Sequence, residues 1–318
     1  MSGASHPRPE PEPALSSRPE LPDGIEPSAP SRPPGRPGVP RFVDPGPREV
    51  PPEQPNAWTP WSAPVAIIGA FIVAFLGQAV ILVIGSFFGM SASDPSPASN
   101  IIATAFQDCA FIGVAIFIAR SAGPVTFGQF GVRRTPIRLA VFWIVAATIS
   151  FYILTAIYSA VFNITNSDNL PDSLGLERST VAFVAVCILV TVIAPLAEEF
   201  LFRGFFFGAV RNWRGPWVAA VITAIVFGGI HVGSAGAEFL PPLAILGFLL
   251  CIVRWRTGSL VPCIMVHSIN NAIAFGVTAG GWGAWQVILL LIGSTSVCLL
   301  ILRPVMARSG DAPARALT

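Results

Sequence analysis

Long apolar runs with few charges dominate this sequence and restrict what it can fold into. A helix that spans a bilayer needs about 20 consecutive apolar residues, and most of the eight runs reach that length. They are residues 63–88, 101–119, 137–162, 180–202, 217–234, 239–253, 260–278 and 283–302. The sixth run is short and fits a tilted or partly re-entrant helix. Because only 11% of the residues are charged, against about 25% in a soluble domain, we expect an all-α, polytopic membrane bundle of about eight helices.

A proline-rich segment precedes the first run. Residues 1–60 contain 18 of the 31 prolines, and such a composition buries too little apolar surface to fold. We therefore expect a disordered cytoplasmic tail at 1–60, a transmembrane domain at 61–303 and a short cytoplasmic tail at 304–318. The chain does not open on a charged stub followed by a short apolar core and a cleavage site, so the sequence predicts no signal peptide.

The basic residues predict the orientation in the membrane. All 19 are arginine, which is typical of a GC-rich bacterial genome. If the tail is cytoplasmic, 18 of the 19 lie on the cytoplasmic side and only Arg178 lies outside. Cytoplasmic loops carry such an excess of positive charge, so we expect an integral protein of the bacterial plasma membrane with both termini inside. The expected partners are the lipid bilayer and a membrane-associated substrate, with no nucleic acid; the oligomeric state is left open.

Ionisable residues within apolar runs are costly and usually functional or paired. The segment "AEEFLFRG" at 197–204 places Glu199 and Arg203 four residues apart, on one helix face. Glu198 points about 100° away. We therefore expect one carboxylate to be held by the arginine and the other to face a cavity. Pro195 removes the hydrogen bond to the Thr191 carbonyl and should kink the helix there.

Two histidines also lie in apolar runs. Phe227 and His231 in "FGGIHV", like His267 and Asn271 in "HSINNA", are four residues apart and share a face. Glu198 and His231 should lie at similar depth on neighbouring helices, so we expect Glu198, His231 and His267 to converge inside the bilayer. We expect two further polar residues, Asp108 and Gln78, to make structural hydrogen bonds, and all five cysteines to pack as buried thiols.

A carboxylate with histidines suits water activation, either by general base catalysis or through a metal. An asparagine beside a histidine suits stabilisation of an oxyanion. The sequence has no G-x-S-x-G, glycine-rich phosphate loop or H-E-x-x-H motif. Peptide hydrolysis inside the membrane fits this set best. A non-proteolytic scaffold or immunity protein and a small-molecule or proton transporter remain alternatives.

The ordered motifs resemble those of the CPBP family of intramembrane proteases, which includes type II CAAX prenyl endopeptidases and bacteriocin-processing or self-immunity proteins. The matching motifs are EExxxR at Glu198, Glu199 and Arg203, FxxxH at Phe227 and His231, and HxxxN at His267 and Asn271. "FGQFGVRRTP" at 127–136 is similar to the family's loop before its third helix. The resemblance covers roughly residues 100–302 and implies a helical bundle with its site open toward the cytoplasmic leaflet.

The resemblance also implies residue roles. Glu198 and His231 would activate the water, His267 and Asn271 would stabilise the oxyanion, and Glu199, Arg203 and Phe227 would support the site. Glu198, His231 and His267 would be the ligands if Zn²⁺ were required, since glutamate and histidine are zinc ligands. Metal-independent water activation is the open alternative. The literal CAAX activity is not implied, because a bacterial host would lack ordinary CAAX prenylation.

Overall fold

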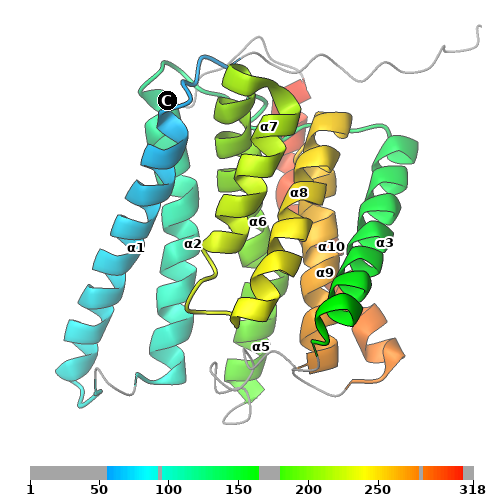
Figure 1. The fold of residues 1–318 in the computed structure, drawn as a ribbon. Helices are drawn as coiled ribbons and strands as arrows, with labels where there is room; N and C mark the ends of the chain where they lie inside the picture. The colour runs from blue at the N-terminus through cyan, green and yellow to red at the C-terminus, as the bar shows by residue number, and fades with distance from the viewer. Residues whose placement is uncertain (1–55, 92–94, 165–179, 279–281, 311–318) are drawn as a thin grey trace, which may run out of the picture. The chain divides into compact units, whose positions relative to one another are not determined.

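The computed structural model describes residues 56–91, 95–164, 180–278 and 282–310. The helices in chain order are α1 (Ser62–Ser86), α2 (Pro97–Arg120), α3 (Ile137–Phe162), α5 (Thr180–Ile188), η2 (Leu189–Ile193), α6 (Ala194–Glu199), η3 (Phe200–Phe206), α7 (Phe207–Gly229), η4 (Ala237–Phe239), α8 (Leu240–Thr257), α9 (Val261–Thr278) and α10 (Ala284–Gly310). The expected all-α bundle is confirmed (Figure 1). The predictions for residues 1–55 and 311–318 lie outside the described residues.

Within these residues, six helices are long and apolar enough to cross a membrane, and Val261–Val277 is a shorter apolar helix. One of the six is the continuous run Thr180–Gly229, which has 50 residues. It contains a break at Gly215, whose φ of 76° is strained for residues other than glycine. The chain reverses at this break, so the run makes two passes (Figure 1). With this run divided in two and Val261–Val277 included, the apolar helical segments of the described residues are roughly consistent with the number expected.

Several helix boundaries differ from the hydropathy-based expectation for local reasons. Helix α2 begins at Pro97 because the Ser96 hydroxyl accepts a hydrogen bond from the Ser99 amide at 3.2 Å, and proline is favourable in a first turn. Helix α7 ends at Gly229 rather than near residue 234. Helix α10 continues through Pro304 to Gly310. The apolar runs in the sequence therefore predict the central parts of these helices better than they predict where the helices begin and end.

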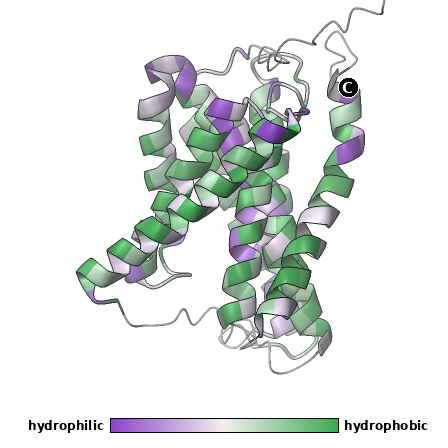
Figure 2. Ribbon diagram, turned by 90° about the vertical axis from the view of Figure 1, so that its right-hand side faces the viewer, coloured by the Kyte–Doolittle hydropathy of each residue, from purple (hydrophilic) through white to green (hydrophobic). Residues whose placement is uncertain are grey.

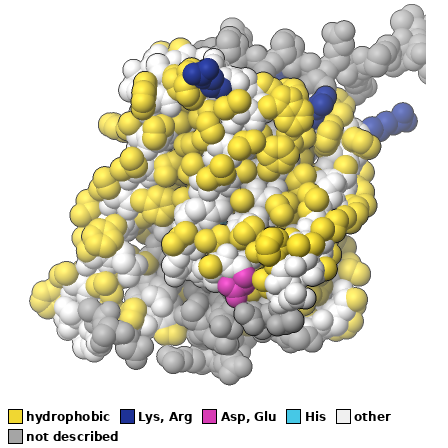
Figure 3. Space-filling model, viewed as in Figure 1, with side chains coloured by type: hydrophobic (Ala, Val, Ile, Leu, Met, Phe, Trp, Pro, Cys, Tyr) yellow, Lys and Arg dark blue, Asp and Glu magenta, His cyan; other side chains and the backbone are white. Residues whose placement is uncertain are grey.

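The helices are apolar along most of their length, and hydrophilic residues gather mainly near one end of the bundle (Figure 2). Arginine side chains lie at that end on the face shown in Figure 3. The start of α1 and the end of α10 also lie there (Figure 1). Large apolar side chains on the outside, such as Phe75 at 74% exposure and Phe117 at 74%, are suited to contact with lipid. This arrangement agrees with an integral membrane protein.

The packed region begins shortly before residue 61, the expected start of the domain. Trp58 is 4% exposed, and its ring centroid lies 4.8 Å from those of Phe130 and Phe205. The Asn212 side-chain amide donates to the Asn56 side-chain oxygen at 2.7 Å and to the Trp58 carbonyl at 3.3 Å. These contacts attach the segment before α1 to the first half of α7.

Candidate active site

The helix that carries Glu198 and Glu199 is irregular on both sides of them. It passes from α5 through the π-helical η2 into α6, and then through the π-helical η3 into α7. Pro195 has no amide hydrogen, so it can donate neither to the Thr191 carbonyl in an α-helix nor to the Val190 carbonyl in a π-helix. Helix α9 supplies a donor to each of these two carbonyls. Ser268 Oγ donates to the Thr191 carbonyl at 2.7 Å, and Asn271 Nδ2 donates to the Val190 carbonyl at 2.9 Å.

The predicted pairing of Glu199 with Arg203 is present. Arg203 Nη1 donates to Glu199 Oε1 at 2.7 Å, and both side chains are fully buried. Arg203 Nη2 donates to the Gly247 carbonyl of α8 at 3.1 Å, and the guanidinium carbon lies 4.3 Å from the centroid of the Phe227 ring. The charge of Arg203 is therefore compensated by a carboxylate, a carbonyl and an aromatic face.

Glu199 also holds His267, a contact that helix periodicity did not predict. His267 Nδ1 lies 2.9 Å from Glu199 Oε1, so one carboxylate oxygen bridges Arg203 and the imidazole. The other ring nitrogen, Nε2, then faces Glu198, with 3.8 Å to its Oε2. That distance is too long for a hydrogen bond but lets one water contact both atoms. Glu198 Oε2 is buried without a hydrogen-bond partner.

Phe227 lies at the centre of the aromatic contacts around the site. Its ring centroid is 5.2 Å from that of His231 and 5.9 Å from that of His267, so the expected packing of Phe227 on His231 is present. His231 follows the end of α7, and its Nδ1 lies 2.8 Å from the Phe227 carbonyl. His231 makes no hydrogen bond or ion pair with Glu198 in the described region. Phe227 thus connects the two histidines, while Glu198 contacts only one of them.

Asp108 was expected to make structural hydrogen bonds, and the structure gives it a different environment. The residue is 2% exposed on α2, and its Oδ2 is buried without a hydrogen-bond partner. Helix α2 packs against α6, and Asp108 interacts electrostatically with Glu198. The only sequence signal for this second carboxylate is that an aspartate in an apolar helix is costly.

The residues around the site do not fit a zinc centre. A zinc site with an open position needs three convergent protein ligands. Among the described residues, no group of three or more histidine, cysteine, aspartate or glutamate side chains is arranged to hold a metal ion. His267 approaches Glu198, whereas His231 makes no hydrogen bond or ion pair with Glu198, so a third ligand does not converge with them in the described part of the chain. Protein groups and water are therefore the components available for chemistry at this site.

The sequence of one segment of this chain is similar to that of a known protein family. Residues 180–273 match the family described as type II CAAX prenyl endopeptidase Rce1-like. This segment is therefore similar to that family. The match supports a CAAX-type intramembrane protease fold, and the resemblance to the CPBP family is confirmed. The matched segment contains all seven residues of the three motifs, whereas Asp108 lies outside it.

Two curated proteins are also similar to this chain. The UPF0177 protein YxdF of Lactococcus lactis subsp. lactis (strain IL1403) is 27% identical over 131 residues, which cover 41% of this chain and 69% of that protein. An uncharacterized 24.3 kDa protein of Escherichia coli is 26% identical over 133 residues, or 39% of this chain and 58% of that protein. The chain thus spans less than two thirds of the second relative. No solved structure matches the chain.

Proposed function

We propose that this protein is an intramembrane endopeptidase that hydrolyses peptide bonds of membrane-associated peptides or proteins. One observation carries the proposal. Glu199 fixes Nδ1 of His267 at 2.9 Å, which aims Nε2 at Glu198 Oε2 across 3.8 Å. A buried carboxylate oxygen without a partner, facing an oriented imidazole, is suited to general base catalysis on a water molecule held between them.

Glu198 takes the first step in this mechanism. It removes a proton from a water molecule as the water oxygen forms a bond to the scissile carbonyl carbon. The carbonyl becomes a tetrahedral oxyanion, and Glu198 becomes protonated. Glu198 then delivers that proton to the amide nitrogen, the carbon–nitrogen bond breaks, and a carboxylic acid and an amine are released. A positioned acid–base group contributes about 100- to 10,000-fold to such a reaction.

The neighbouring residues orient these groups. Glu199 and Arg203 hold His267, whose Nε2 can contact the water or, when protonated, donate to the oxyanion. Asn271 uses one amide hydrogen on the Val190 carbonyl, which leaves the second for the oxyanion. His231 donates through Nδ1 to Phe227, so its Nε2 can contact water or substrate from the other side of the Phe227 ring.

The test compares membrane proteomes of cells with the parent protein, Glu198→Gln and Glu238→Gln. Glu238 lies in η4, outside the cluster, and provides the matched control. We expect substrates to accumulate uncut with Glu198→Gln and to be cut normally with Glu238→Gln. The purified parent protein should then cleave a peptide from such a substrate, and Glu198→Gln should lose at least about 100-fold in kcat. A biological phenotype that survives Glu198→Gln, with no uncut substrate, would favour a non-proteolytic scaffold.

A further inference from the structure

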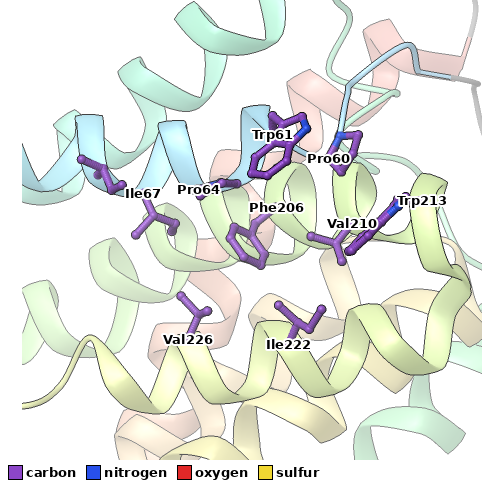
Figure 4. Close-up of a pocket in the computed structure, with 10 residues that line it drawn as sticks. Pro60, Trp61, Pro64, Ile67, Phe206, Val210, Trp213, Ile222 and Val226 are labelled. Atoms are coloured by element: carbon purple, nitrogen blue, oxygen red, sulfur yellow. The ribbon is translucent and has the colours of Figure 1, made fainter.

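A separate apolar cavity lies between α1, η3 and both halves of α7. Its volume of about 400 Å³ falls in the range of about 300–1,000 Å³ that is usual for ligand sites. The residues of the three motifs do not line it. The walls include Trp61, which precedes α1, Ile67 from α1, Phe206 from η3, and Trp213, Ile222 and Val226 from α7 (Figure 4). Such a lining suits a hydrocarbon chain, since it leaves a polar ligand without hydrogen-bond partners.

The cavity has a distinct outer end. Trp61 and Trp213 lie at one end of it, with Ile67 and Val226 farther along (Figure 4). Trp61 is 79% exposed and Trp213 is 53% exposed, and both tryptophans flank apolar helical segments. Tryptophans in such positions lie at the level of the lipid headgroups. A chain that fills the cavity therefore extends into the bilayer from a headgroup near the two tryptophans.

Positive charge lies beside that end. The guanidinium carbon of Arg214 is 4.4 Å from the centroid of the Trp213 ring, and that of Arg211 is 5.6 Å from the Phe207 ring. Arg214 is exposed, so its charge is available to a headgroup. Guanidinium groups bind phosphate through paired hydrogen bonds. An anionic headgroup at this position would be attracted, whereas a zwitterionic one would offset the attraction with its own cation.

We propose that this cavity binds one acyl chain of an anionic phospholipid, whose headgroup lies against Trp213 and Arg214. The inference rests on the apolar walls, the exposed tryptophans at one end and the adjacent guanidinium. It is independent of the proposed hydrolysis. The bound lipid would pack on Phe206, the last residue of the π-helix that carries Arg203, and on the turn that reverses the chain at Gly215.

The experiment uses the full chain in vesicles of equal parts phosphatidylglycerol and phosphatidylcholine. In one set only the phosphatidylglycerol carries brominated acyl chains, and in the other only the phosphatidylcholine does. Bromine quenches tryptophan fluorescence on contact, so the ratio of quenching between the sets measures local enrichment. The difference in quenched fluorescence between the parent protein and Trp61→Phe gives the contribution of Trp61, and so of the cavity. This difference is called the Trp61 component. We expect brominated phosphatidylglycerol to quench this component more strongly.

Two pairs of variants locate the effect. Arg214→Gln should reduce the preference for phosphatidylglycerol about fivefold, the effect of about one basic residue at a membrane surface. Arg308→Gln removes the same charge from the last turn of α10, where no cavity residue lies, and should leave the preference unchanged. Ile222→Phe or Val226→Phe should reduce quenching by both lipids in the Trp61 component. Thermal melting of each variant checks that it remains folded.

Two outcomes would overturn the proposal. Equal quenching by the two lipids that does not respond to Arg214→Gln would make the cavity part of a nonspecific lipid shell. Displacement of the brominated lipid by a neutral acylated peptide, at a lower concentration than by phosphatidylglycerol, would assign the cavity to a lipid-modified substrate.

Discussion

Asn271 on α9 donates its side-chain amide to the Val190 carbonyl at 2.9 Å, and that carbonyl belongs to the π-helical turn before Pro195. The Ser268 hydroxyl makes the equivalent contact with the Thr191 carbonyl at 2.7 Å. The proline removes one backbone donor from this stretch, and a neighbouring helix donates to both carbonyls. The segment that carries Glu198 is thereby attached to the helix that carries His267.

The Asn271 and Ser268 bridges allow a comparison between catalysis and packing. Asn271→Ala should lower kcat about 100- to 1,000-fold with KM nearly unchanged, because an oxyanion donor acts mainly in the transition state. Ser268→Ala removes the neighbouring bridge and should cost about 0.6 kcal/mol of stability while turnover stays near normal. Steady-state kinetics and thermal melting of both purified variants are the measurements. Normal turnover in a destabilised Asn271→Ala would make Asn271 a packing residue only.

Asp108 should show a trade-off between stability and activity. A buried carboxyl oxygen without a partner destabilises the fold, so Asp108→Leu should raise the melting temperature. Activity should fall, because the Asp108 carboxyl interacts electrostatically with Glu198 and its removal changes the environment of the proposed base. Asp108→Asn keeps the shape and serves as the comparison. If Asp108→Leu were less stable than the parent protein and fully active, Asp108 would have only a structural role.

The Glu199–Arg203 pair should behave as one unit in unfolding. Either Glu199→Gln or Arg203→Met alone strands a buried charge and should cost about 3–5 kcal/mol. The double variant should be less damaging than the sum of the two single changes, by an interaction energy of about 0.5–3 kcal/mol. Melting in detergent of all four proteins gives the cycle. Additive losses would mean that the two charges do not depend on each other.

Gly247 should be required for the close contact of α8 with α7. A Cβ at this position would lie 3.1 Å from Ala224 Cα and 3.2 Å from the Phe227 ring. Gly247→Ala should therefore displace the carbonyl that binds Arg203, and lower both stability and turnover. Gly293→Ala on α10 is the control, because a Cβ there meets nothing within 4 Å. It should stabilise α10 by about 0.5–1 kcal/mol. Equal effects of the two changes would refute the packing argument.

The orientation can be tested at the two ends of α2. Ser96 and Ser121 are the capping residues of this helix and are both exposed. In a cysteine-free background in intact cells, Ser96→Cys should react with an impermeant thiol reagent, and Ser121→Cys should react only after lysis. The reverse pattern would invert the assignment made from the arginines.

The sequence alone determined much of the membrane architecture. Apolar runs predict the spans because each helix must present a hydrophobic surface to lipid. The spacing of Glu199 and Arg203 predicts their pairing, because residues four apart are neighbours on a helix. The pair is present even though the backbone hydrogen bonds change from α-helical to π-helical in this segment. Pro195 likewise predicts an irregular helix, since its missing donor is a local property.

The tertiary structure decided how the motifs meet. His267 is 68 positions from Glu199, and no period in the sequence reveals that one carboxylate oxygen contacts both His267 and Arg203. The burial of Asp108 near Glu198, and the attachment of Trp58 beneath Phe205, also depend on which helices are neighbours. Local spacing indicates which side chains share a face of one helix. Only the packing of helices against one another determines which faces meet.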